Sequence, residues 1–303
     1  MSREVTLIKV DAVTKSFGAK TVLEGVTLTV PDGSVMGFVG PNGAGKTTLM
    51  KIIVGLLEAQ GGTVSVDGRP YADAPLPARS IGALISAEWL PGRLKAESVL
   101  RYACDVHRLP PSRVGELLAE VGLEQVGGQR IKRYSLGMRQ RLGLALALVA
   151  DPQNLILDEP VNGLDPDGVL WLRSFLRHQA GRGKAVFLSS HLMSELELVA
   201  DDVIMLSEGH VVRQGRVAEL TSTSTQTYVE SPDVGRLAAV LGAHGFAVAP
   251  QGQGLVVTSD DTMEIGRLAF TEGPGLTQLK RITESLENLY RQSTVGEHHA
   301  KEL

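Results

Sequence analysis

The stretch GPNGAGKTT, Gly40 to Thr48, decides the fold of this chain. It fits the pattern G-x-x-x-x-G-K-[ST], in which backbone N–H groups of a glycine-rich turn hold phosphate groups. The apolar run VMGFV precedes it, and the helix-like run TTLMKIIVGLL continues from it. A phosphate loop needs this strand–turn–helix context, because the positive end of the helix dipole adds to the N–H groups. We therefore predict a phosphate-binding loop here.

Two side chains of this loop are expected to do chemistry beyond binding. Lys46 is predicted to reach the terminal phosphates, and the Thr47 hydroxyl to ligate Mg²⁺. The candidate phosphate-binding residues are those of the loop itself, namely Gly40, Pro41, Asn42, Gly43, Ala44, Gly45, Lys46, Thr47 and Thr48.

The apolar run NLILDEP, Asn154 to Pro160, reads as a strand that ends in two acids. Ligands of parallel sheets sit at the carboxyl ends of the strands. Since successive side chains of a strand point to opposite sides, the two acids are expected to have different tasks. Asp158 suits Mg²⁺ through its water shell, and Glu159 suits the attacking water as general base.

Working outward from these motifs, strands alternate with helices, which predicts a largely parallel sheet. A mostly helical block interrupts this alternation mid-chain, as an inserted subdomain. We predict a nucleotide-binding domain at 1–220 with its helical subdomain at about 87–150, and the polar run TSTSTQT as a linker at 221–227. The remainder, 228–303, reads as a small α+β domain resembling a split βαβ unit, with a last helix at Ile282–Arg291.

The composition and the length of the apolar runs argue against a nucleic acid partner and against a membrane-spanning helix. The 303 residues are 43% apolar and 21% charged, with a formal net charge of −4, so we expect no nucleic acid partner. The best apolar run, Leu142 to Ala150, is far shorter than the roughly 20 residues of a spanning helix. A membrane role therefore has to come from a partner.

Five motifs in order make the chain resemble the nucleotide-binding subunit of a bacterial ABC transporter, over about Val5 to Leu220. The resemblance implies a P-loop α/β fold of the ABC type, with a parallel-sheet core, an antiparallel β subdomain and a helical subdomain. The motifs are the loop at 40–48, YSLGMRQR at 134–141, LILDEP at 155–160, NGLDP at 162–166 and SSH at 189–191.

The run YSLGM is similar to the signature of this family, usually written LSGGQ. The family pairs two such domains head to tail, so that each ATP lies between the phosphate loop of one and the signature of the other. The resemblance thus places Ser135, Leu136, Gly137 and Met138 against the ATP of a second subunit. Leu136 and Met138 depart from the consensus and match a variant associated with bacterial drug- and bacteriocin-type exporters.

The resemblance implies roles for three more residues. Phe17 holds the position of the aromatic residue that stacks on adenine. His191 matches the histidine that contacts the γ-phosphate and positions water. Asp165 belongs to the loop that links the two ATP sites across the dimer.

One family position is not filled as expected. Members usually carry a glutamine, which touches Mg²⁺ and water, after the strand that enters the helical subdomain. Here the segment is IGALISAEWLPGR, Ile81 to Arg93, with Ser86 at that position and Glu88 two residues on. Whether Ser86 or Glu88 joins the metal stays open. Trp89 and Leu90 are candidates for partner contact.

Together these observations predict an ATP-hydrolysing motor subunit of an ABC transporter of exporter type, using ATP and Mg²⁺. We expect a homodimer, or pairing with a similar ATPase subunit, on separate integral membrane permease subunits. The chain would be cytoplasmic and peripheral on the inner face of the cell membrane. Two alternatives stay open, an ATP-dependent clamp with little hydrolysis and a soluble ABC ATPase without a transport role.

Overall fold

A computed structural model of the protein describes residues 7–221, 226–282 and 284–301. Contacts within the chain divide it into two compact units, Met1–Val217 with Tyr290–Leu303, and Ala218–Leu289. Each unit has a hydrophobic core of its own.

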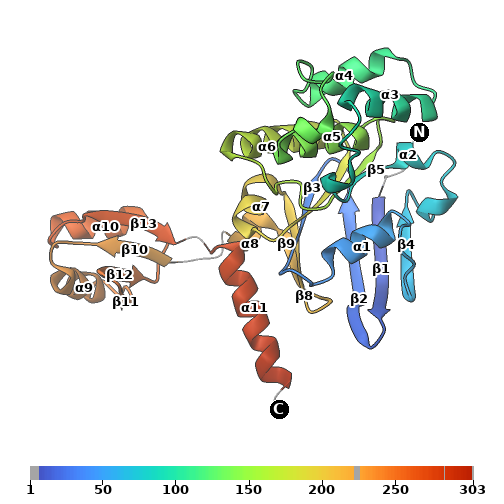
Figure 1. The fold of residues 1–303 in the computed structure, drawn as a ribbon. Coiled ribbons are helices and arrows are strands. Elements are labelled where there is room, and N and C mark those ends of the chain that lie inside the picture. The colour runs from blue at the N-terminus through green and yellow to red at the C-terminus, as the bar shows by residue number, and fades with distance from the viewer. Residues whose placement is uncertain (1–6, 222–225, 283, 302–303) are drawn as a thin grey trace, which may run out of the picture. The chain divides into compact units, whose positions relative to one another are not determined.

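A six-stranded sheet forms the centre of the first unit (Figure 1). Its strand order is β5-β6-β7-β3-β8-β9, with all neighbours parallel except β8 and β9. Strands β3, β6 and β7 are buried along their whole length, which fits their continuous apolar sequences. The strands are β3 (Val35–Val39), β5 (Ile81–Leu84), β6 (Asn154–Leu157), β7 (Ala185–Ser190), β8 (Asp202–Ser207) and β9 (His210–Arg216).

An antiparallel sheet of order β2-β1-β4 packs beside it. In β2 the residues alternate between buried and exposed from Val26 to Val30, as expected for a sheet with one face on the core. The strands are β1 (Leu7–Phe17), β2 (Lys20–Pro31) and β4 (Gly61–Val66).

Helices α1, α6 and α7 of the first unit follow strands of the central sheet, and α3, α4 and α5 form the helical subdomain between β5 and β6. Helix α5 contacts β5 and both α3 and α4, so it joins the subdomain to the sheet. This confirms the predicted fold class, a parallel-sheet core with an antiparallel sheet and inserted helices. The helices are α1 (Lys46–Ile53), α2 (Pro77–Ser80), α3 (Ala96–Val106), α4 (Ser112–Glu120), α5 (Leu136–Ala147), α6 (Pro166–Gly181) and α7 (Met193–Val199), with short turns η1 (Tyr71–Asp73), η2 (Ala87–Trp89) and η3 (Ile131–Arg133).

The second unit has an antiparallel sheet of order β11-β12-β10-β13. Strand β12 lies between β10 and β11, which is the predicted split βαβ arrangement. Apolar residues of α9, α10 and the sheet form one core. The elements are α8 (Val217–Thr221), β10 (Gln226–Glu230), α9 (Val234–Ala243), β11 (Val248–Gln251), β12 (Gly254–Val257), α10 (Thr262–Thr271) and β13 (Gln278–Ile282).

Three predicted boundaries differ from the structure. The C-terminal domain, predicted to run to 303, ends at Leu289, because Tyr290–Leu303 groups with the first unit. Of the expected linker, residues 222–225 lie outside the described residues, but Thr221 ends α8 and Thr227 is buried in β10. The last helix, α11 (Leu286–Lys301), begins later than the predicted Ile282, because Ile282 pairs in β13. The Ser285 hydroxyl accepts from the Asn288 N–H in the first turn of α11 (3.2 Å).

Candidate functional site

The phosphate loop connects β3 to α1, as predicted, and two of its glycines are required by close contacts. Gly45 has φ of +110°, and a Cβ there would lie 2.6 Å from the Val22 carbonyl oxygen. At Gly40 a Cβ would collide with the Leu206 carbonyl oxygen. Side chains at these positions would push the loop away from its neighbours, so the loop keeps its shape only with glycine.

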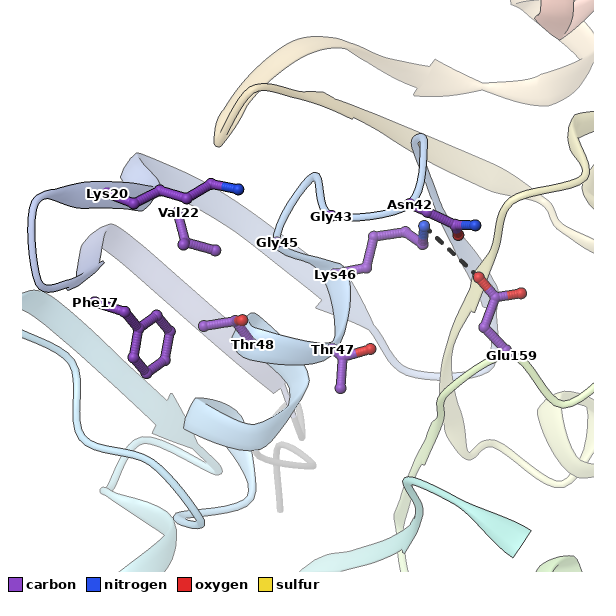
Figure 2. A pocket seen from close by; sticks show the side chains of 10 residues that line it. All are labelled: Phe17, Lys20, Val22, Asn42, Gly43, Gly45, Lys46, Thr47, Thr48 and Glu159. Carbon is purple, nitrogen blue, oxygen red and sulfur yellow. Dashed lines mark ion pairs between the residues drawn. The ribbon is translucent and has the colours of Figure 1, made fainter. Parts of the chain in front are cut away.

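A pocket of about 380 Å³ lies over this loop. Figure 2 shows Phe17 and Glu159 at opposite ends of it, with loop residues between them. Phe17 is 51% exposed, so its ring is available for a planar ligand. The lining residues are Phe17, Lys20, Val22, Asn42, Gly43, Gly45, Lys46, Thr47, Thr48 and Glu159.

Lys46 has its ammonium group inside the loop. Its Nζ donates to the carbonyl oxygens of Gly40 (2.6 Å) and Pro41 (3.2 Å), and lies 3.6 Å from Glu159 Oε1. The side chain is 6% exposed. A buried positive charge at the base of a glycine loop favours anionic ligands.

The two acids after β6 face different partners, as predicted, although the reason is not strand alternation. β6 ends at Leu157, and Glu159 has a left-handed backbone with φ of +48° that turns the chain. The Asp158 carboxylate accepts from Thr47 Oγ1 at 2.6 Å. Hydroxyl and carboxylate oxygens side by side are the hard donors that Mg²⁺ prefers.

Ser189, near the end of β7, lies in the SSH motif, but the sequence assigns no role to it. Its hydroxyl donates to Asp158 Oδ1 (2.6 Å) and accepts from the Glu159 N–H (2.8 Å). One buried serine therefore fixes both acids. The pairing of β7 with β6 brings Ser189 next to the two acids, and the local sequence pattern does not predict that pairing.

Glu159 and His191 form a hydrogen-bonded pair. Glu159 Oε2 lies 2.8 Å from His191 Nδ1 and accepts from the His191 N–H at 3.3 Å. With Lys46 near the other oxygen, the carboxylate is held from both sides. The structure thus brings together all three residues predicted to be catalytic.

A third carboxyl group, that of Glu195 on α7, has a pKa that responds to the charges of this pair. Burial raises the pKa of Glu195, the His191 charge lowers it, and the negative Glu159 raises it further. Its Oε2 is buried and has no hydrogen-bond partner among the described residues.

The signature residues begin α5, away from the pocket of their own chain. Ser135 caps the helix, since its Oγ accepts from the Met138 N–H at 3.1 Å. Ser135 is exposed and Leu136 is 43% exposed. None of the residues 135–138 lines the described pocket.

The remaining candidates have local contacts only. Ser86 caps η2, where its hydroxyl accepts from the Glu88 N–H at 3.3 Å, and Glu88 is exposed. In the described part of the chain neither side chain hydrogen-bonds to Thr47 or Asp158. Asp165 caps α6, with its Oδ1 accepting from the Gly168 N–H at 2.8 Å. A metal role for Ser86 or Glu88 and a dimer role for Asp165 stay predictions.

A glycine loop between strand and helix, a buried lysine and a hydroxyl–carboxylate pair define a P-loop nucleotide-binding protein. A family model described as ABC transporter matches residues 23–162, and one described as a domain of unknown function (DUF8746) matches 225–287. The chain belongs to the ABC transporter ATP-binding proteins and is an ATPase of that type.

Relatives agree with this assignment. The chain is 34% identical to the uncharacterized ABC transporter ATP-binding protein YhcH of Bacillus subtilis (strain 168), over 95% of this chain and 96% of that protein. It is 37% identical to the lantibiotic transport ATP-binding protein SrtF of Streptococcus pyogenes, over 68% of this chain and 89% of the relative. A solved ATP-binding subunit of an ABC transporter superposes with a TM-score of 0.64 at 31% identity, covering 71% of this chain and 92% of that one.

Proposed function

We propose that the protein is the ATP-hydrolysing motor of an exporter, working as a head-to-tail dimer on separate membrane subunits. The observation that carries this proposal is the joined set of Lys46, Glu159 and His191 beside the phosphate loop. A base, its orienting partner and a phosphate-binding cation in contact are the parts that ATP hydrolysis needs.

In the proposed reaction Glu159 takes a proton from the attacking water, and His191 holds the carboxylate in place. Lys46 exchanges the carbonyl oxygens of Gly40 and Pro41 for phosphate oxygens of ATP. Phe17 stacks on the adenine at the other end of the pocket. A general base of this kind contributes about 10²–10⁴-fold to the rate.

Mg²⁺ fits the oxygen pair of Thr47 and Asp158, which lie 2.6 Å apart. When bound, it would neutralise charge on the phosphate oxygens. The described residues contain no cluster of three or more His, Cys, Asp or Glu suited to a metal. Mg²⁺ that arrives with nucleotide needs no such cage, because it keeps waters and phosphate oxygens as ligands.

The dimer is supported by the signature. Its residues Ser135 and Leu136 are exposed and lie outside the pocket of their own chain, which supports a second chain bringing its signature to each ATP. The free N–H groups at the start of α5 then meet the γ-phosphate.

A membrane partner is supported by exposed apolar side chains. Trp89, in η2, is 68% exposed, and Tyr102 and Val106 on α3 are 72% and 59% exposed. Tyr102 and Val106 are four residues apart and so share one face of the helix. In the described residues no helix has the length and apolar character to span a membrane. The exporter assignment rests on the similarity to a lantibiotic transport protein and the YSLGM variant.

The test compares the full chain with Glu159→Gln and with Glu116→Gln, a matched change at an exposed ion pair. We expect wild type and Glu116→Gln to hydrolyse ATP and Glu159→Gln to lose at least about 100-fold in kcat. Light scattering with Mg·ATP should show the mass of Glu159→Gln doubling. Turnover unchanged in Glu159→Gln would refute the role of this base, and no turnover in wild type would favour the clamp.

A further inference from the structure

The first turns of α5 pack against the NGLDP loop, 162–166, of the same chain. The tightest contact joins Leu136 to Gly163. A Cβ at position 163 would collide with Leu136 Cδ2 and lie 2.5 Å from Leu136 Cγ. The leucine therefore occupies the space that a side chain at 163 would need.

Two further contacts continue this packing. At Gly137 a Cβ would lie 3.2 Å from Leu164 Cδ2. The Gln140 side-chain amide donates to the Asn162 carbonyl oxygen at 3.4 Å. Three successive loop residues thus each meet one residue at the start of α5.

The loop is attached to the hydrolytic residue at one end and to α6 at the other. The Asn162 N–H donates to the Glu159 carbonyl oxygen at 3.2 Å. At the far end Asp165 caps α6. A shift of Gly163 would therefore act on the backbone of Glu159, four residues away, which holds a left-handed conformation.

We propose that Leu136 is a positioning residue that fixes the NGLDP loop, and through it Glu159, relative to the signature. This inference rests on the proposed function, in which the signature meets the ATP of the partner subunit. ATP held at one site then influences the base of the other site through the Leu136–Gly163 contact. Leucine in place of the consensus glycine provides the side chain that makes this contact.

The test is a set of full-chain variants, Leu136→Ala, Gly163→Ala and the double variant. The control is Gly68→Ala. Gly68 and Gly163 both have φ of +76°, but a Cβ at Gly68 meets nothing within 4 Å. Both substitutions force alanine into a left-handed backbone conformation, which lowers stability. Only the alanine at 163 also collides with the Leu136 side chain. The readouts are kcat for ATP, the Hill coefficient of turnover against ATP, and thermal unfolding.

We expect Gly68→Ala to keep near wild-type turnover. Gly163→Ala should lose about tenfold or more in kcat, because small displacements of a catalytic group are costly. Leu136→Ala should lose about two- to fivefold and lower the Hill coefficient. The double variant should be more active than Gly163→Ala, since the collision is gone.

Three results would overturn the inference. The first is that Gly163→Ala has the same kcat as Gly68→Ala. The second is that Gly163→Ala lowers kcat by the same factor in wild type and in the Leu136→Ala background. The double variant could also recover in thermal unfolding while kcat and the Hill coefficient do not, which would make the contact packing alone. Failure of the proposed function is distinguishable, because wild type itself would then show no ATP turnover, and the inference would fall with it.

Discussion

At the scale of single residues, the backbone conformation of Glu159 orients the two acids that follow β6. Glu159 takes a left-handed backbone that glutamate seldom adopts, and its N–H is held by the Ser189 hydroxyl. Conformations of this kind persist where surrounding contacts enforce them, and they gather at functional sites. With this conformation at Glu159, Asp158 faces Thr47 while Glu159 faces Lys46 and His191.

A second residue-scale contact, away from the pocket, is the ion pair of Lys184 and Asp151. Lys184 is 5% exposed, and its Nζ lies 2.5 Å from Asp151 Oδ1 and donates to the Pro152 carbonyl oxygen (2.7 Å). Burial pushes the pKa of Asp151 upward, but the hydrogen bond and charge of Lys184 outweigh it and lower that pKa. Breaking this pair leaves the buried lysine without its counter-charge.

Asp151→Asn should lower the free energy of unfolding by about 1–3 kcal/mol at pH 7, less than a fully buried pair because Asp151 is 55% exposed. Asparagine tolerates the φ of +50° at this position. Because the folded pKa of Asp151 is lowered, its stabilisation is present above about pH 4 and is lost as pH falls through the folded value. Urea unfolding at several pH values measures this.

The control for this change is the same substitution in a Lys184→Met background. Without the buried charge, Asp151→Asn should cost little. A difference between wild type and Asp151→Asn that stays constant from pH 7 to pH 3 would contradict the assignment.

At the scale of elements, the start of α5 combines a structural and a functional task. Ser135 satisfies one helix N–H and, in the proposed dimer, meets the ATP of the partner. Asp233 caps α9 in the second unit in the same way, with its Oδ1 2.9 Å from the Arg236 N–H. Comparing variants of the two caps therefore distinguishes a loss of helix stability, expected for both, from a loss of ATP contact, expected for Ser135 alone.

Ser135→Ala and Asp233→Ala should each lower stability by about 1 kcal/mol, since each removes an N-cap. In a Glu159→Gln background, only Ser135→Ala should weaken dimer formation with Mg·ATP. Light scattering against ATP concentration measures the difference. Equal dimerisation of the two variants would argue against the signature facing ATP.

At the scale of the whole molecule, the two units have separate cores. Leu268 is fully buried in the core of the second unit, while Leu279 of the same unit is 39% exposed. Both tryptophans of the chain, Trp89 and Trp171, belong to the first unit. Tryptophan fluorescence therefore reports on one unit and far-ultraviolet circular dichroism on both.

Leu268→Ala should destabilise the second unit by about 2–5 kcal/mol, the range for a buried leucine, and Leu279→Ala much less. The dichroism transition should begin at lower denaturant while the fluorescence transition and ATP turnover stay unchanged. If both transitions move together, the units unfold as one.

The sequence by itself determined the family, the phosphate loop, the two acids and the split βαβ unit. The loop and the acids each lie in one short run, and the family and the split βαβ unit follow from the order of several such runs along the chain. Within each run, glycine spacing, apolar periodicity and helix capping act locally. The tertiary structure alone decided that Ser189 bridges both acids, that Lys46 reaches Glu159, and that Leu136 covers Gly163. Such contacts depend on strand order and packing between segments far apart in the chain, which no local pattern of residues fixes.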